Sequence, residues 1–133
     1  MSATAHGSFD VNLTPAAPAA GEPAEIARLV LDKTFSGDLT GTSQGQMLAI
    51  RTATEGSAGY VAMEIVTAEL AGKSGTFALQ HTGTINRGAA SLSVTVVPDS
   101  ATGELTGLSG TMNIDITAEG HRYTFDYTLP ASS

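Results

Sequence analysis

The chain contains no cysteine among its 133 residues, which excludes disulfides, thiol nucleophiles and thiolate metal sites. Basic residues are also scarce, because only six Lys and Arg stand against 13 Asp and Glu, and the formal net charge is −7. The six are scattered along the chain, so there is no basic stripe that could neutralise phosphates. We therefore expect neither a nucleic acid nor an anionic membrane surface as a partner.

Targeting and metal-binding patterns are missing as well. The N-terminus has no basic segment followed by an apolar run, so no signal peptide is evident. No apolar stretch approaches the length needed to cross a membrane. The patterns H-x-H and H-E-x-x-H do not occur. These absences predict a soluble, cytoplasmic protein with no metal and no cofactor.

The composition is that of a folded, strand-rich domain. Hydrophobic residues make up 41% of the chain and charged residues only 14%, which is typical of a globular protein and not of a disordered one. The 15 glycines, together with plentiful Ala, Thr and Ser, favour strands and tight turns over helices. We expect one domain over 1–133, with short flexible termini and a Pro/Ala-rich surface loop, TPAAPAAGEPAE, at 14–25.

Apolar and polar residues alternate with a period of two along most of the chain, which is the pattern of half-buried strands. The cleanest case is HRYTFDYTL at 121–129. No segment keeps a helical period over three turns, although the spacing in AEIARLVL (24–31) also fits a short helix. The pattern predicts eight strands, at 8–13, 26–35, 39–53, 57–66, 70–82, 91–97, 105–117 and 121–129. An antiparallel sheet of eight strands most often closes into a barrel, because closure removes unpaired edges.

The pentapeptide GTSQG at 41–45 matches the G-x-S-x-G pattern of a serine-hydrolase nucleophile elbow. An elbow needs a strand, a sharp turn and then a helix, whereas the residues that follow, QMLAIRT, are typical of a strand. A related acid-Leu-x-Gly-x-Ser stretch recurs at 69–78 and 104–113, as expected for a hairpin unit repeated around a barrel. We interpret these glycines as points where the sheet bends, with the turn of the second copy near 67–68, and Ser43 as a small residue tolerated at such a bend.

The few polar residues that interrupt the apolar strands are the candidates for chemistry. In YVAMEIV, Glu64 is a lone carboxylate among apolar residues; burial would raise its pKa and suit it to proton transfer. Lys33 shares a strand face with Leu31 and Phe35, so it could form an ion pair with Glu64 inside the barrel. The alternative is an outward Glu64 on a half-exposed strand.

Gln80 and His81 are neighbours in ALQHTG, so one of them faces into the barrel and the other faces out. An inward His81 could act as an acid or base, because imidazole titrates near neutrality, or could be a structural hydrogen-bonding group. His6 and His121 are expected at the surface. Tyr123 could stack on a ligand, although an aromatic strand face is more often core. The candidate catalytic residues are Glu64 and His81, and the candidate ligand-binding residues are Lys33, Glu64, Gln80, His81 and Tyr123.

Four stretches together cover most of the chain: DKTFSGDLTGTSQGQML (32–48), GSAGYVAMEIVTAELAGKSGTFALQHTGT (56–84), SLSVTVVPDSATGELTGLSGTM (91–112) and YTFDYTLP (123–130). They resemble a family of small bacterial proteins of unknown function, and GSAGY and LQHTG are the most specific runs. That family is assigned to the allene-oxide-cyclase-like barrel fold, so the resemblance independently implies an eight-stranded antiparallel barrel. Allene oxide cyclases and dirigent proteins, which share this barrel type, steer reactive small molecules inside an apolar cavity.

Two hypotheses of function remain open. In the first, the barrel encloses a small apolar molecule, with Glu64 and either His81 or Gln80 as polar anchors, and could catalyse an isomerisation or cyclisation by confinement and proton transfer. In the second, the barrel is filled by its own side chains and acts as a non-catalytic homo-oligomeric module. An exposed apolar strand face, VAMEI at 61–65, favours a dimer or trimer.

Overall fold

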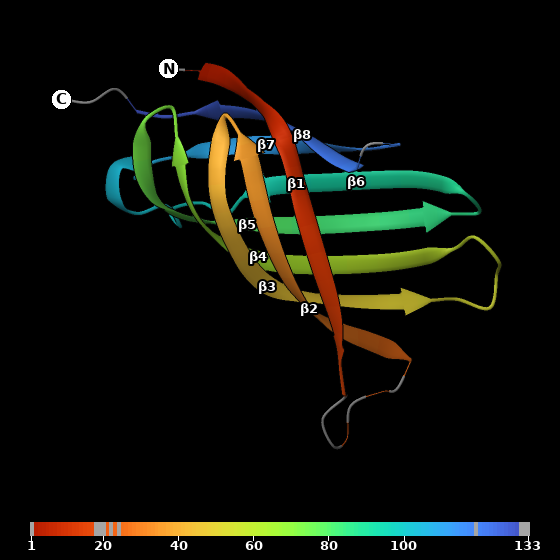
Figure 1. Cartoon of the computed structure of the whole chain (residues 1–133). Coiled ribbons are helices and arrows are strands. Elements are labelled where there is room, and N and C mark those ends of the chain that lie inside the picture. Colours follow the sequence, from red (N-terminus) through yellow and green to blue (C-terminus); the bar gives the residue numbers. More distant parts are fainter. Residues whose placement is uncertain (1, 18–20, 22, 24, 119, 131–133) are drawn as a thin grey trace.

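Each strand pairs with its neighbours in the sequence, so the sheet is an up-and-down meander that closes on itself. The structure is a computed structural model that describes residues 2–17, 21, 23, 25–118 and 120–130. Strand β8 pairs with β1, and this pairing closes an antiparallel barrel (Figure 1). The elements are β1 (Ser2–Ala16), β2 (Ile26–Gly37), β3 (Leu39–Arg51), β4 (Ala58–Leu70), β5 (Lys73–Asn86), β6 (Ala89–Val96), a short 3₁₀ helix η1 (Gly103–Leu105), β7 (Ser109–Thr117) and β8 (Gly120–Thr128).

The predicted eight-stranded antiparallel barrel is therefore confirmed. The helical alternative for AEIARLVL is wrong, because residues 26–31 lie in β2, where all of them pair with β3 and residues 28–31 also pair with β1. Strand β1 is longer than the predicted 8–13, since cross-strand pairing continues at both of its ends. Its residues 14–16 shorten the predicted loop, of which 18–20, 22 and 24 lie outside the described residues.

The described N-terminal residues are paired in the barrel, whereas the sequence predicts short flexible termini. Ser2 already pairs with Thr128, so β1 begins at the second residue. Residues 1 and 131–133 lie outside the described residues. None of the described residues forms a helix long and apolar enough to cross a membrane.

The turn of the second repeated stretch is not near 67–68. Strand β4 continues to Leu70, which pairs with Lys73 across a two-residue turn of Ala71 and Gly72. Both turn residues have positive φ, 54° and 79°, as in the type I′ turns that match the twist of a hairpin. In the third stretch the helix η1 comes first, so β7 begins later than the predicted 105.

Both glycines of GTSQG allow the backbone of β4 to lie close against β3. A Cβ atom on Gly41 would overlap the carbonyl oxygen of Thr67, and a Cβ atom on Gly45 would overlap that of Met63. Any other residue at these positions would push the two strands apart. The motif therefore lies within a continuous strand, as the bend interpretation predicts and as a nucleophile elbow would not.

One half of the barrel is filled by its own side chains. Their rings pack together, with centroids of Phe77 and Phe125 6.0 Å apart and those of Phe35 and Tyr123 5.8 Å apart. The side chains that are no more than 2% exposed include Phe35, Leu39, Leu70, Phe77, Leu79, Leu105, Tyr123 and Phe125. This filled end lies next to the β4–β5 turn and η1.

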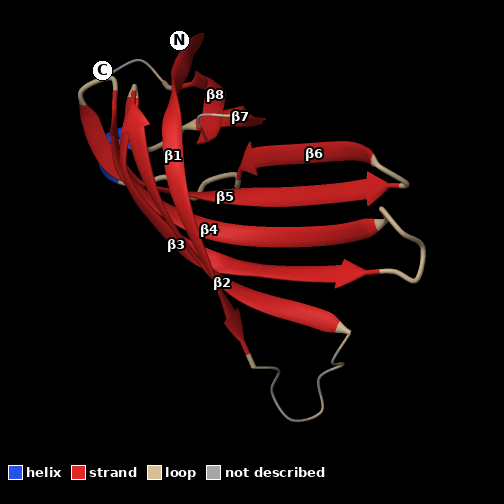
Figure 2. Ribbon diagram, turned by 45° about the vertical axis from the view of Figure 1, so that its right-hand side comes forward, coloured by secondary structure: helices blue, strands red, loops and turns tan. Residues whose placement is uncertain are grey.

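The opposite half is the open end, where the β3–β4 and β5–β6 hairpins project away from the filled end (Figure 2). Its inward apolar side chains remain accessible: Leu13 is 45% and Leu92 42% exposed. The pairing between neighbouring strands is also least extensive there. Among the described residues, β6 and β7 pair only at Thr95 and Thr111, so the two strands diverge toward the open end.

Candidate ligand site

A cluster of four polar side chains lies inside the barrel between the filled end and the open end. They come from four consecutive strands: Lys33 on β2, Ser43 on β3, Glu64 on β4 and His81 on β5. Their exposed fractions are 7%, 2%, 1% and 4%. Lys33 pairs directly with Ser43 across β2 and β3. Glu64 lies two residues along β4 from the partner of Ser43, and His81 lies two residues along β5 from the partner of Glu64. Gly45 is opposite Glu64, and a Cβ atom at this position would crowd the Cα and Cβ atoms of Glu64.

Glu64 is the centre of the cluster and uses both of its carboxylate oxygens. Lys33 Nζ donates to Oε2 at 2.9 Å, and Ser43 Oγ donates to Oε1 at 2.8 Å. His81 Nε2 lies 2.6 Å from the same Oε2. An ionised carboxylate only accepts hydrogen bonds, so Nε2 carries the hydrogen in this contact.

The partners of Glu64 decide its ionisation. Burial by itself would raise the pKa of Glu64, but the hydrogen bond from His81 and the positive charge of Lys33 together lower it from 4.5 to about 2. The pKa raised by burial that we expected from the sequence is therefore wrong in sign. At neutral pH Glu64 is ionised and acts as an acceptor, not as a proton donor.

The ammonium of Lys33 lies over two aromatic rings as well as against Glu64. Its Nζ is 4.8 Å from the ring centroid of Phe9 and 5.9 Å from that of Phe35. Cation–π contacts of this kind favour a desolvated cation. Together with the Glu64 carboxylate they compensate for removing the charge of Lys33 from water.

An apolar cavity of about 240 Å³ opens above this cluster and is lined by residues of all eight strands. Lys33 and His81 line it, whereas Glu64 lies behind them. A second hollow of about 340 Å³ at the mouth shares wall residues with the first. Sites for small molecules typically measure about 300–1,000 Å³, so the two together offer room for a small ligand. The apolar wall includes Leu13, Leu31, Met47, Leu92, Ile114 and Ile116.

The structure brings some of the sequence-predicted site residues together and separates others. It pairs Lys33 with Glu64, which was one of the two arrangements left open by the sequence, and turns His81 inward. Gln80 is exposed on the outer face, because side chains alternate along β5. Tyr123 belongs to the filled end, where its hydroxyl oxygen accepts from the Leu39 N–H at 2.9 Å and contacts the carbonyl oxygens of Ser36 and Leu39, each at 3.0 Å. Neither Gln80 nor Tyr123 lines the interior cavity.

Sequence reasoning missed Ser43, Tyr60 and His121. Ser43 has a hydrogen-bonding role beyond the small size expected of it. His121, expected at the surface, is half-buried, lines the cavity and stacks on Phe9 with a centroid distance of 5.1 Å. The alternation that placed Tyr123 inward could have placed His121 there too. Tyr60 also lines the cavity, and its pKa is raised by burial and by the charge of Glu64.

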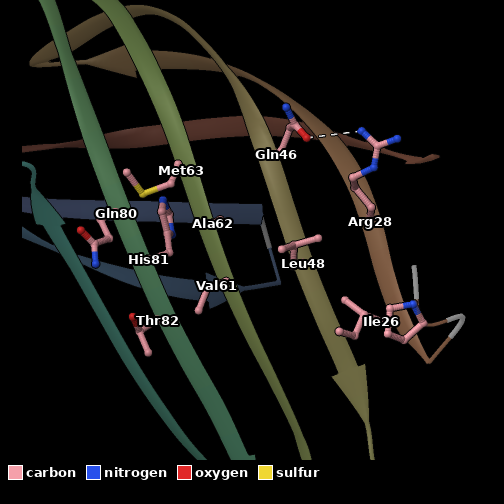
Figure 3. Close-up of a pocket in the computed structure, with 11 residues that line it drawn as sticks. Ile26, Arg28, Gln46, Leu48, Val61, Ala62, Met63, Gln80, His81 and Thr82 are labelled. Atoms are coloured by element: carbon pink, nitrogen blue, oxygen red, sulfur yellow. Dashed lines mark hydrogen bonds between the residues drawn. The ribbon is translucent and has the colours of Figure 1, made fainter. Parts of the chain in front are cut away.

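A larger groove, about 590 Å³, lies on the outside of the sheet over β2 to β5 (Figure 3). Its apolar side chains include Ile26, Leu48, Val61 and Met63. Arg28 crosses one side and donates from Nη1 to Gln46 Oε1 at 3.4 Å. Apart from His81 and the half-buried Arg28, whose Nε is buried without a hydrogen-bond partner among the described residues, the polar side chains that line the groove are exposed. The buried, mutually bonded ionic groups are inside the barrel, so the interior is the better candidate for chemistry.

No three His, Cys, Asp or Glu side chains of the described residues are grouped so that they could hold a metal ion.

Two comparisons relate the chain to other proteins. A family model described as "Protein of unknown function (DUF3224)" matches residues 5–127. The crystal structure of a protein of unknown function from the DUF3224 family of Shewanella oneidensis MR-1 is 45% identical, with a TM-score of 0.90, and the match covers 99% of this chain and 100% of that one. No curated protein matches the chain.

Proposed function

Because the chain belongs to the DUF3224 family, a family of unknown function, we propose a function from the site itself: the barrel binds a small, mainly apolar molecule in its interior cavity. The observation that carries the proposal is an apolar cavity whose floor is formed by the buried ionic cluster. Pockets that combine apolar walls with a few convergent polar groups are typical ligand sites. The allene-oxide-cyclase-like fold type and the cytoplasmic location stay predictions from the sequence.

The uneven filling of the barrel supports this proposal. The inner surface of the barrel is packed with aromatic rings at the filled end. At the open end the inward side chains of Leu13, Leu92 and Ile116 remain accessible. Apolar surface left in contact with water costs about 25 cal/mol per Å². A ligand that covers these side chains recovers part of that free energy, which gives the cavity an affinity for apolar molecules.

We expect the wild-type protein to bind the neutral fluorophore N-phenyl-1-naphthylamine and to melt at a higher temperature in its presence, because a ligand that binds only the folded state stabilises it. Replacing Leu92 with tryptophan places a larger side chain at the mouth of the cavity. It should weaken binding by roughly tenfold, or about 1.4 kcal/mol. Fluorescence titration measures both affinities.

The matched control for this experiment is Leu48→Trp. Leu48 is 44% exposed against 42% for Leu92, but it faces the outer groove and not the interior. This variant should keep the wild-type affinity. If the wild type does not bind the fluorophore, or if both variants lose affinity equally, the interior is not the binding site.

A second candidate function, self-association, is favoured by the outer face of β3 and β4. Leu48, Val61, Met63 and Ile65 are all between 44% and 56% exposed on this face. Contiguous exposed apolar side chains of this kind mark interaction surfaces, and a second copy of the chain offers the same surface by symmetry.

We expect light scattering to give the mass of a dimer or trimer for the wild type and a lower mass for Met63→Glu, because a carboxylate in an apolar interface loses its hydration. Thr67→Glu is the control, since Thr67 is exposed on the same face of β4 but nearer the filled end. A monomeric mass for the wild type would rule out this function.

A further inference from the structure

His81 is held in the way that a general base is held in a catalytic dyad. Its Nε2 is fixed 2.6 Å from the Glu64 carboxylate, and the ionised carboxylate requires the hydrogen to be on Nε2. In the neutral imidazole the lone pair is then on Nδ1. Nδ1 has no hydrogen-bond partner within the part of the chain that the structure describes, and the residue lines the cavity. A carboxylate that orients an imidazole in this way fixes the tautomer and stabilises the imidazolium that forms.

Lys33 provides hydrogen-bond donors next to this base. An ammonium carries three N–H groups, and within the described residues one of them is accepted, by Glu64. Lys33 Nζ and His81 Nε2 contact the same oxygen, at 2.9 and 2.6 Å, so the donor and the base are neighbours on the cavity floor. A carbonyl oxygen of a bound molecule could accept from Lys33 while the rest of that molecule lies along the apolar wall.

The charges around the cavity suit an oxygen that gains negative charge. The chain has 13 Asp and Glu, yet none of their side chains is among the described residues that line this cavity. The titratable groups that do line it are Lys33, Tyr60, His81 and His121. These groups are cationic or neutral, so a developing oxyanion meets no carboxylate at the cavity surface.

We propose that the barrel interior catalyses proton transfer in an apolar carbonyl compound that has a hydrogen on the carbon next to the carbonyl, with His81 as the base and Lys33 as the hydrogen-bond donor to the carbonyl oxygen. This inference rests on the proposed function, because the compound must first bind in the cavity. Glu64 is a positioning residue, since it acts through His81 and Lys33.

The reaction conserves atoms and electrons without a further reactant. The C–H bond next to the carbonyl breaks, its proton goes to Nδ1 of the neutral His81, and its electron pair forms the carbon–carbon double bond of an enolate. The negative charge is then on the oxygen that Lys33 contacts. The imidazolium then either exchanges its proton with water and protonates the same carbon, which exchanges the hydrogen, or delivers the proton to a conjugated carbon, which moves a double bond.

The test uses 2-decanone in deuterated water and follows the loss of the signals of the hydrogens next to its carbonyl by proton NMR. We expect the wild type to accelerate exchange by about 10²–10⁴-fold over the same buffer, which is the usual contribution of a general base. His81→Gln should reduce the rate to the buffer value, because its amide can still donate to Glu64 but cannot take a proton. His6→Gln, at an exposed position on β1, should exchange as fast as the wild type.

Binding and exchange are measured separately, by the shift in melting temperature with 2-decanone and by NMR. We expect His81→Gln to keep the shift and lose the exchange. Binding by the wild type without accelerated exchange overturns the inference and leaves the proposed function standing, as does exchange that persists in His81→Gln. The absence of binding to both 2-decanone and the fluorophore overturns both.

Discussion

Replacing Glu64 with alanine is expected to lower the free energy of unfolding by about 3–5 kcal/mol, which is the usual cost of breaking a buried ion pair from one side. The substitution leaves the Lys33 ammonium, 7% exposed, and the Ser43 hydroxyl without their acceptor. It also opens a space beneath the cavity floor. Urea denaturation measures the effect as a lower midpoint at an unchanged slope.

Two further variants show whether the buried charge is the cause. Glu69→Ala removes a carboxylate from the exposed face of the same strand and should change stability by no more than about 0.5 kcal/mol. The double variant Lys33→Met with Glu64→Leu removes both ions, and it should be more stable than Glu64→Ala because apolar replacement of a whole buried pair is often neutral. Equal losses for Glu64→Ala and Glu69→Ala would contradict this account.

Acid is expected to destabilise the protein through the same carboxylate, by about 3 kcal/mol between pH 4.5 and pH 2. The pKa of Glu64 is about 2 in the folded protein against an ordinary value of 4.5. As the pH falls, the unfolded chain therefore binds this proton first. The stabilisation is complete above the unfolded value of 4.5 and is lost as the pH falls through the folded value of about 2.

The contribution of Glu64 is isolated by comparing variants, because other carboxylates also titrate in this range. Glu64→Gln has no proton to bind at this position, so its unfolding free energy should fall less steeply with acid than that of the wild type. Glu69→Gln keeps the buried carboxylate and should follow the wild type. Urea unfolding at several pH values gives the slopes, and parallel slopes for the wild type and Glu64→Gln would refute the assignment.

The strands could be predicted from the sequence because a period of two is visible without any knowledge of pairing. Their ends could not be predicted as well, since they depend on cross-strand partners and on turn chemistry. Strand β1 extends to Ser2 only because β8 is beside it. The Ala71–Gly72 turn was overlooked because alanine rarely adopts the positive φ that it has there.

The candidate site was predictable only in part, for a related reason. An apolar strand interrupted by Glu64, and a lysine on an apolar face, indicated the ion pair correctly. Because successive side chains of a strand point to opposite faces, the sequence showed that Gln80 and His81 face opposite ways, but it did not show which of them faces inward. The pKa of Glu64 was misjudged because burial is visible in one strand, whereas the partners that outweigh it come from β2 and β5.

Because β6 and β7 have a single paired position among the described residues, the barrel is closed less completely between these two strands than between the others. From Thr95 and Thr111 toward the open end, separating the two strands breaks no ladder hydrogen bond between described residues. The β7–β8 hairpin stays attached to β1 along the other side. Leu92 on β6 and Ile114 on β7 both line the cavity, one on each side of the gap in strand pairing. A molecule bound in the cavity, as we propose, would lie next to this unpaired stretch between β6 and β7.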